Sequence, residues 1–476
     1  MLDSGPTLYV DLDGTFIKSD MLLETFISAI KNKPFLLFLV PIWLIKGKAF
    51  LKEKLAIHAE VDVSVIPVNV NTYQFIQDQK SNGTKIILAT ASNEIIARQF
   101  IQSYSVFDDF IASSGHTNLK GKTKLTAIQE QTHSFSYVGN SSEDFILFDK
   151  AEKSYLVAPT SAAKKLYNKK SNNIELINES TNSSSVKVWL KQLRVHQWIK
   201  NILIFVPIIV SNKYTDIHLV LSTLAGFLVF SLLASSTYII NDLVDLDSDR
   251  VHPRKRKRPL SSSEISILNG IIGSLIILTL SFVTALFIST DFVVTLIGYL
   301  VLTLTYSFKI KRYFAMDVIA LASLYTLRIF AGAAILEVTV SFWLLSFSMF
   351  VFLSLALVKR CAELISLGNE NKNKITGRDY NSHDLNVFIS FGSASSLLSV
   401  LMYCFYMNSE VLSNQYQEPQ LLWLALPAFG YWLMRMWVKT VRGEMHDDPI
   451  VYTLKDKGSL ISVGIMVSVT IAAHIF

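Results

Sequence analysis

The sequence predicts two domains: an N-terminal α/β domain of the Rossmann type with a helical cap, and a C-terminal all-α membrane domain of about nine transmembrane helices. Up to about residue 185, short apolar runs alternate with polar stretches, and beyond it long apolar runs dominate. The mean hydropathy of +0.38 is high for a soluble protein, and 476 residues suffice for two or three domains. We expect an α/β domain over 1–175, an Asn/Ser-rich linker over 168–185 and a membrane domain over 186–476.

Charge and cysteine content narrow the class of protein. The formal net charge is only +6, and the basic residues cluster in loops between apolar runs, which favours a membrane over a nucleic-acid partner. Both cysteines, Cys361 and Cys404, lie in the apolar half, so no disulfide framework is implied. The first fifteen residues lack the basic and apolar regions of a secretory signal, so we expect the first domain in the cytoplasm.

Four short motifs follow one another in the N-terminal domain. The run 7–12 reads as a strand that ends in DLDGT, and two acids with a glycine turn at the carboxyl end of a strand stand where α/β sheets bind ligands. The run 85–89 is a second strand, followed by Thr90. Lys124 lies in GKTKLTAI, and YVGN at 137–140 begins a strand end that reaches Asp144.

These motifs resemble, in order, those of the haloacid dehalogenase (HAD) phosphatase superfamily. The resemblance implies that Asp11 is the nucleophile and Asp13 the general acid/base, while Thr90 and Lys124 hold the phosphate. Where the family usually has an acid after the fourth motif's glycine, this chain has an asparagine, so a binding or regulatory domain without activity is the alternative. The implied Mg²⁺ ligands are Asp11, Asp13, Asn140 and Asp144.

An insert over about 17–80 separates the first two motifs and is long enough for a small helical cap. Inside it, the apolar segment 34–45 has twelve residues, fewer than the ~20 that span a bilayer. Lysines flank the segment on both sides. Either it forms the apolar core of the cap, or it dips into the membrane surface with its lysines at anionic headgroups.

The stretch 241–258, NDLVDLDSDRVHPRKRKR, places a cluster of acids directly before a block of cations. On one continuous helix, Asp242, Asp245 and Asp249 fall at i, i+3 and i+7 and share a face. Mg²⁺ binds such carboxylates and shares its shell with substrate phosphates, and the cations, Arg254 and Arg258 among them, would hold the rest of a diphosphate. The alternative is a solvated loop whose positive charge only sets membrane topology.

Long apolar runs predict the membrane spans, and the basic residues predict their orientation. The loops after the second, fourth, sixth and eighth spans carry many lysines and arginines, whereas the opposite loops hold only Lys213. This asymmetry places the N-terminal domain and the basic loops in the cytoplasm and the C-terminus outside. The spans lie near 196–212, 217–241, 263–288, 291–308, 314–336, 341–360, 384–408, 418–438 and 457–476.

The pattern NDxxDxxxD at the end of the second span, with HPRKRKRPL behind it, resembles the first aspartate-rich motif of the UbiA superfamily of membrane prenyltransferases. The resemblance covers the chain from about residue 186. It implies a polyprenyl chain held among the helices and diphosphate chemistry in a Mg²⁺-lined cavity that faces the cytoplasm.

Charged residues within the spans are expected to face the same cavity, because each is costly in lipid unless it meets water or a partner. Asp317 and Arg328 are about three turns apart on one helix face, and a mutual salt bridge is the alternative explanation for them. The other cations suit phosphate groups. The candidate substrate-binding residues are Arg194, Lys200, Asn241, Arg254, Arg258, Tyr306, Lys311, Asp317, Arg328, Lys359, Arg360 and Glu363.

Four further stretches, among them YSFKIKR and RGEMHDDPIVYTLKDKGS, resemble the UbiA branch that makes decaprenylphosphoryl-5-phosphoribose. That branch uses a polyprenyl phosphate acceptor and phosphoribosyl pyrophosphate (PRPP) as donor. The second aspartate-rich motif of the aromatic prenyltransferases is absent, since the loop after span six opens with KRCAE. The fused phosphatase would then dephosphorylate the lipid-linked product.

Two other functions remain open at this point. The first is transfer of a prenyl group from a polyprenyl diphosphate to an aromatic or other small acceptor. The second is a transporter or lipid-binding scaffold with a regulatory HAD-like domain, because a charge pair within the membrane, such as Asp317 with Arg328, is also found in transporters.

Overall fold

The computed structural model describes residues 7–115, 117–170, 174–177, 185–369, 379–409, 416–445 and 448–475. Contacts within the chain divide it into two compact units. The first comprises residues 1–193 and 239–273, and the second comprises residues 194–238 and 274–476. The aspartate-rich segment therefore belongs to the same unit as the α/β domain.

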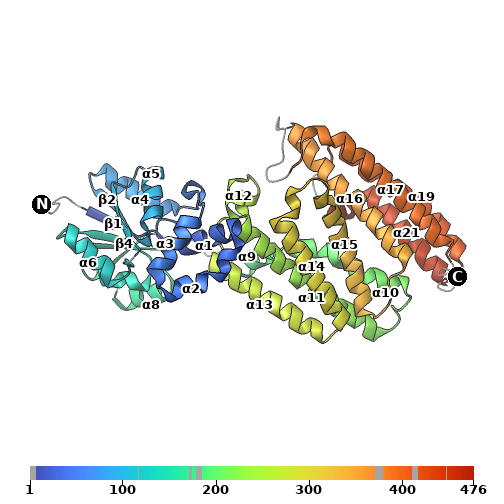
Figure 1. The fold of residues 1–476 in the computed structure, drawn as a ribbon, viewed down its shortest axis with the longest axis horizontal. Helices are drawn as coiled ribbons and strands as arrows, with labels where there is room; N and C mark the ends of the chain where they lie inside the picture. Colours follow the sequence, from blue (N-terminus) through green and yellow to red (C-terminus); the bar gives the residue numbers. More distant parts are fainter. Residues whose placement is uncertain are drawn as a thin grey trace. The chain divides into compact units, whose positions relative to one another are not determined.

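The first unit is built on a six-stranded sheet in the order β3-β2-β1-β4-β5-β6 (Figure 1). Every neighbouring pair of strands is parallel, and the order reverses direction beside β1, where α/β folds bind ligands. This confirms the predicted Rossmann-type fold class. The strands are β1 (Thr7–Val10), β2 (Lys85–Asn93), β3 (Asp109–Ser113), β4 (Ser136–Gly139), β5 (Lys153–Val157) and β6 (Ile174–Ile177).

Helices connect these strands, as parallel pairing requires. Six short helices follow β1 and form the predicted cap: α1 (Met21–Asn32), η1 (Pro34–Phe38), α2 (Val40–Ile45), α3 (Lys48–His58), η2 (Val63–Val65) and α4 (Val70–Ser81). The later connections are α5 (Glu94–Ser103), α6 (Lys122–Gln131), η3 (Ser142–Asp144), α7 (Phe145–Phe148) and α8 (Ser161–Lys170).

Strand β6 corrects part of the predicted linker. Ile174–Ile177 pairs in parallel with β5, so the sheet extends into the segment that composition assigned to a linker. The apolar residues at both ends of this strand are the local signal that the Asn/Ser-rich composition concealed. Residues 171–173 and 178–184 of the expected linker lie outside the described residues.

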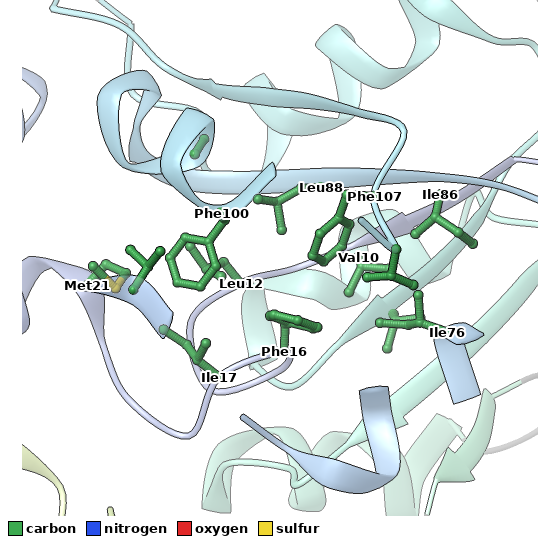
Figure 2. Packing of buried hydrophobic residues seen from close by; sticks show 14 of the residues in the cluster. Val10, Leu12, Phe16, Ile17, Met21, Ile76, Ile86, Leu88, Phe100 and Phe107 are labelled. Atoms are coloured by element: carbon green, nitrogen blue, oxygen red, sulfur yellow. The ribbon is translucent and has the colours of Figure 1, made fainter. Parts of the chain in front are cut away.

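Both faces of the sheet are covered, and β1 shows how. Its side chains alternate between two hydrophobic cores: Leu8 and Val10 belong to one, and Tyr9 belongs to the other. All three are buried, as expected of a central parallel strand. Figure 2 shows the first core, where the Phe16 and Phe107 rings pack below the strand that carries Leu88. These cores fix the loop 11–15 that follows β1.

The apolar segment 34–45 contributes side chains to a core of the cap and also exposes several apolar side chains. Leu36 and Trp43 are buried in a small core of the cap with Leu51 and Leu55, as a cap core requires. Leu39 and Val40 are half-buried against this core, and the other large apolar side chains of the segment are exposed, with Phe38 at 79% and Ile45 at 87%. Such a concentration of exposed apolar residues marks an interaction surface. We define the exposed patch as Phe35, Leu37, Phe38, Ile42, Leu44 and Ile45. Its contact with the membrane surface stays a prediction.

The membrane helices agree with the predicted fold class. Eight described helices are long and apolar enough to span, and a ninth is possible as a bent pair. The eight spans are Ile217–Val244 (α11), Ile267–Leu286 (α13), Thr290–Phe308 (α14), Met316–Ile335 (α15), Phe342–Ser366 (within α16, Phe342–Asn369), Ser382–Met407 (η8 and α17, Leu385–Met407), Pro419–Val441 (η9 and α19, Ala425–Val441) and Lys457–His474 (within α21, Lys457–Ile475).

The bent pair corresponds to the first predicted span, 196–212. It joins α9 (Ser185–Gln192) to η5 (Val195–Phe205) and α10 (Val206–Val210) at an angle of 49°. The bend falls at Arg194, whose φ of 51° is left-handed and cannot continue a helix. Helix η5 packs closely against α15 at Gly332. A Cβ at this position would collide with the Ile204 carbonyl, so the close approach requires glycine.

The exposed patch generates a test of membrane contact. A nitroxide placed at Phe38 in a Cys361→Ser/Cys404→Ser background should be more accessible to oxygen than to a polar nickel chelate when the chain is in lipid bilayers, because the patch would be immersed in the apolar interface. Ile57, which is 53% exposed on the same cap, is the matched control and should favour the nickel chelate. Equal accessibility ratios at the two positions would refute membrane contact.

Candidate active sites

The first candidate site lies at the carboxyl end of β1. The Asp11 carboxylate follows this strand and accepts a hydrogen bond from the Lys124 ammonium at 2.7 Å. Lys124 also donates to the Tyr137 hydroxyl at 3.1 Å. The Asp11–Lys124 pair is almost fully buried, and it brings together two predicted residues that are far apart in the sequence.

Asp13 is held by two hydrogen bonds from different elements. The backbone N–H of Met21 donates to its Oδ1 at 2.7 Å, and the Ser92 hydroxyl donates to its Oδ2 at 3.1 Å. The backbone N–H of Ser92 in turn donates to the buried Thr90 hydroxyl at 2.9 Å. Ser92, which the sequence reasoning missed, thus joins Thr90 to Asp13. The sequence signal that could have identified Ser92 is its position two residues after Thr90 in LATAS.

Asp144 completes this site from the loop after β4. Its Oδ2 accepts backbone hydrogen bonds from Asn140 at 3.1 Å and from Ser141 at 2.8 Å, and the Tyr137 hydroxyl donates to Oδ1 at 3.0 Å. Asn140 packs against Gly14, where any Cβ would collide with the Asn140 amide. Together with a φ of +72°, this contact requires glycine in the DLDGT turn.

Burial disfavours the charged forms of the carboxylates in this site, and a bound cation would favour them. Burial raises the pKa of Asp11 to about 6 despite Lys124, and burial with the nearby Asp20 and Asp11 charges raises the pKa of Asp13 to about 7. Lys52 of the cap, also missed from the sequence, donates to the Ala91 carbonyl at 2.6 Å, and burial lowers its pKa.

The second candidate site is the aspartate-rich segment of the same unit, which is not one continuous helix. Helix α11 ends at Val244, and Asp245 is the N-cap of a separate short helix, α12 (Leu246–Val251). The prediction that the three acids share one helical face is therefore wrong in its premise, because the helical period is interrupted at the second acid. Nevertheless, the chain brings Asp242 and Asp249 together.

Arg258 joins these two acids. Its Nη1 donates to Asp242 Oδ1 at 3.0 Å and to Asp249 Oδ2, and both carboxylates are buried. Lys255 Nζ lies 3.3 Å from Asp249 Oδ1. Gln192, a residue that the sequence reasoning missed, donates to Asp242 Oδ2 at 2.9 Å. Two buried carboxylates therefore converge on one cationic group, the guanidinium of Arg258.

Both sites offer carboxylates of the kind that bind Mg²⁺. Among the described residues, no three His, Cys, Asp or Glu side chains already form a metal cage. Mg²⁺ commonly binds through one or two protein carboxylates together with substrate phosphates. The convergence of Asp242 and Asp249 on one cation, and the raised pKa values of Asp11 and Asp13, fit this mode of binding.

The second unit contains a buried polar cluster centred on Asp448. This carboxylate accepts hydrogen bonds from Lys200 at 2.7 Å, from Lys359 at 3.4 Å and from the Tyr325 hydroxyl at 3.1 Å. Burial opposes ionisation, but the two lysines hold the pKa of Asp448 well below its usual range. The sequence reasoning missed Asp448, although an Asp before Pro449 is a helix N-cap signal.

The intramembrane pair Asp317 and Arg328 does not form. Asp317 pairs with Arg360 Nε at 2.7 Å and accepts a hydrogen bond from the Tyr380 hydroxyl. Arg328 instead donates to Asn201 Oδ1 at 2.9 Å and lies over three aromatic rings. The mutual salt bridge is therefore wrong as an explanation, because each side chain finds a nearer partner on a neighbouring helix.

Arg360 is the centre of a second buried network in this unit. Besides Asp317, it pairs with Glu363 at 2.6 Å and donates to the Tyr306 hydroxyl at 3.0 Å. The side chains of Arg360 and Asp317 are both 0% exposed. This burial corrects the expectation that both face a substrate cavity: in the structure they hold helices together.

The remaining predicted substrate-binding residues, three cations and Asn241, lie at or near helix ends. Arg194 stands at the bend between α9 and η5 with its guanidinium 5.0 Å from the centre of the Tyr238 ring. Arg254 is the N-cap of η6 (Lys255–Lys257), within the basic block. Lys311 lies in η7 (Ile310–Arg312), directly after α14. Asn241 lies in the last turn of α11, next to Asp242.

Comparison with known proteins agrees with this architecture. Residues 203–455 match the model of the UbiA prenyltransferase family. The uncharacterized protein y4nM of Sinorhizobium fredii is 38% identical over 95% of this chain and 88% of its own length. Decaprenyl-phosphate phosphoribosyltransferase of Mycobacterium tuberculosis is 28% identical over 37% of this chain and 59% of its own length.

A solved structure of a UbiA homolog from Archaeoglobus fulgidus, bound to GPP and Mg²⁺, aligns with 60% of this chain and 99% of its own length at 17% identity and a TM-score of 0.46. The chain belongs to the UbiA prenyltransferase family. Its N-terminal parallel α/β domain fits the HAD-like fold.

The raised pKa values predict the pH dependence of a phosphatase reaction at Asp11. A nucleophile must be ionised, so kcat/KM should fall below about pH 6 at limiting Mg²⁺. A general acid must be protonated, so kcat/KM should also fall above about pH 7. Mg²⁺ favours the ionised nucleophile, so saturating Mg²⁺ should move the acidic limb to lower pH.

Hydrolysis of p-nitrophenyl phosphate across pH 4–9 measures both limbs. Asp13→Asn should remove the basic limb while it lowers the rate about 10²–10⁴-fold. An acidic limb that stays at the same pH from limiting to saturating Mg²⁺ would contradict the assignment of Asp11.

Proposed function

We propose that the membrane domain transfers a 5-phosphoribosyl group from PRPP to a polyprenyl phosphate. The observation that carries this proposal is the convergence of two buried carboxylates, Asp242 and Asp249, on one cation position beside a basic segment. Such a site suits a diphosphate leaving group. The similarity to decaprenyl-phosphate phosphoribosyltransferase supports PRPP as the donor.

In this reaction the C1–O bond of PRPP breaks, pyrophosphate leaves, and an oxygen of the lipid phosphate forms the new bond to C1. Mg²⁺ would neutralise charge on the leaving pyrophosphate. Arg258, 27% exposed at its side chain, would turn from the two aspartates to the pyrophosphate oxygens. Lys255 lies beside Asp249 and would offset further negative charge.

The second unit supplies cations suited to the lipid phosphate. Lys200 and Lys359 both donate to Asp448, which keeps a buried and a partly exposed ammonium group close together. An arriving phosphate monoester would compete with this carboxylate for the same donors. We therefore propose these lysines as ligands of the lipid phosphate.

We further propose that the α/β domain is a phosphatase that removes the 5-phosphate from the new lipid-linked sugar. Asp11 attacks the phosphorus while Asp13 protonates the leaving hydroxyl, and Asp13 then takes a proton from the water that releases phosphate. Lys124 would offset charge on the transferred group from its position 2.7 Å from Asp11. Hydrolysis would also make the overall transfer harder to reverse.

Location supports this order of reactions. The charge asymmetry of the loops supports a cytoplasmic α/β domain, on the side where PRPP is available. A phosphatase covalently attached to the transferase meets the product at a high effective concentration. A soluble sugar phosphate is the alternative substrate for Asp11.

Substitution tests the donor site. Asp242→Asn and Asp249→Asn should each lower phosphoribosyl transfer at least a hundredfold in the folded chain, because each removes a charge from the shared cation position. Asp245→Asn should also abolish transfer if Asp245 turns into the same shell when substrate binds. Labelled PRPP with polyprenyl phosphate in bilayers measures transfer.

Exposed Asp109, on β3, gives the control variant Asp109→Asn, which should keep full transfer. Labelled polyprenyl diphosphate with aromatic acceptors, assayed in parallel, decides between the two enzyme classes. Prenyl transfer without phosphoribosyl transfer would replace the proposal by its rival. No transfer of either kind would favour a scaffold or transporter.

A second substitution tests the phosphatase. The wild-type chain with PRPP and polyprenyl phosphate should yield the dephosphorylated lipid ribose, whereas Asp11→Asn should stop at the 5-phosphorylated lipid because the nucleophile is lost. Mass spectrometry of the lipids distinguishes the two by one phosphate. If both proteins accumulate the same phosphorylated species, the α/β domain acts on another substrate.

A further inference from the structure

An ion pair joins the cap of the α/β domain to the aspartate-rich segment within the first unit. Arg250 of α12 donates to Glu24 of α1 twice, from Nη2 to Oε1 at 2.6 Å and from Nη1 to Oε2 at 3.1 Å. The exposed fractions of the two side chains are only 3% and 2%. A bidentate arginine–carboxylate pair of this kind fixes the orientation of both side chains as well as the distance between them.

On one side, the pair is one helical turn from the phosphatase candidate site. Helix α1 begins at Met21, whose backbone N–H donates to Asp13, and Glu24 lies in the same first turn. The Ser19 hydroxyl also donates to Glu24. Met21 and Ile17 belong to the same hydrophobic core of the α/β domain, and Figure 2 shows both side chains. The position of Glu24 is therefore set by the α/β core.

On the other side, the pair adjoins the donor candidate site. Arg250 directly follows Asp249, which shares Arg258 with Asp242. Asp247 lies 3.9 Å from Arg250 Nη1, so a second carboxylate is already within reach of this guanidinium. The Nε of Arg250 makes no hydrogen bond among the described residues. Glu24 thus provides all the hydrogen bonds described for a buried arginine at the edge of the aspartate cluster.

We propose that Glu24 is a positioning residue of the transfer site, supplied by the fused domain. Arginine keeps its charge in proteins, and a buried guanidinium that loses its partner remains as an uncompensated positive charge. Besides Glu24, the carboxylate described near Arg250 is Asp247 in the same helix. Asp249, the preceding residue of α12, lies next to Arg250 in the chain. By neutralising Arg250, Glu24 keeps an uncompensated positive charge away from the position beside Asp249 where Mg²⁺ would bind with pyrophosphate. The inference rests on the proposed donor site.

The experiment measures Mg²⁺-dependent binding of labelled inorganic pyrophosphate to the full chain in bilayers, with Asp11→Asn in every protein to prevent hydrolysis at the other site. Glu24→Gln should raise the half-saturating Mg²⁺ concentration about tenfold, the usual effect of losing a residue that orients a ligand. The control is Glu94→Gln, which changes an exposed acid in the first turn of α5 and should have no effect.

A second variant separates positioning from support of the fold. Arg250→Met removes the competing cation, so it should leave the half-saturating Mg²⁺ concentration near that of the wild type even where the melting temperature falls. Glu24→Leu/Arg250→Met should likewise bind Mg²⁺ and pyrophosphate normally, since replacing both charges removes the unpaired group. If Glu24→Gln does not fold, Glu24→Asp replaces it, with a smaller increase expected.

The outcomes distinguish this inference from the function on which it rests. Equal weakening by Glu24→Gln and Arg250→Met, or no weakening by Glu24→Gln, would overturn the positioning role. Asp242→Asn should abolish Mg²⁺-dependent pyrophosphate binding. Binding that survives Asp242→Asn would refute the donor site itself.

Discussion

The need to pair every buried charge organises this protein. A charged side chain taken out of water is costly unless a partner compensates it, and each candidate site is built around such a pair. Asp11 meets Lys124 in the α/β domain, Asp242 and Asp249 share Arg258, and Lys200 meets Asp448 among the membrane helices. The pairs preserve ionised groups in places where isolated ones would be neutralised or expelled.

Exposure separates pairs that can exchange partners from pairs that cannot. The Arg258 side chain is 27% exposed while its aspartates are buried, so an incoming phosphate can reach the guanidinium without opening the core. Arg360 and Asp317 are fully enclosed and fixed further by Tyr380, which suits a support between helices. Arginine–aspartate pairs thus suit substrate binding where solvent reaches the arginine, and they suit support between helices where it does not.

The aspartate-rich segment belongs to the same compact unit as the α/β domain, so the α/β domain is more than a tethered neighbour of this segment. A flexible tether would supply only proximity between two independent enzymes. A buried ion pair between Glu24 and Arg250 also constrains geometry, because its two hydrogen bonds require a defined approach of α1 to α12. The fused domain therefore belongs to the architecture around the aspartates as well as carrying a site of its own.

Local patterns in the sequence determined the fold class, the membrane spans and the motif residues of the α/β site, because strand–turn motifs and apolar runs are encoded in neighbouring residues. The tertiary structure alone decided which charges meet. Asp317 pairs with Arg360 rather than with Arg328, and Asp448 pairs with Lys200. The helix ends before Asp245, yet Asp242 and Asp249 both contact Arg258. Pairing depends on the distances between packed elements, and spacing along one helix carries no information about the neighbour that packs against it.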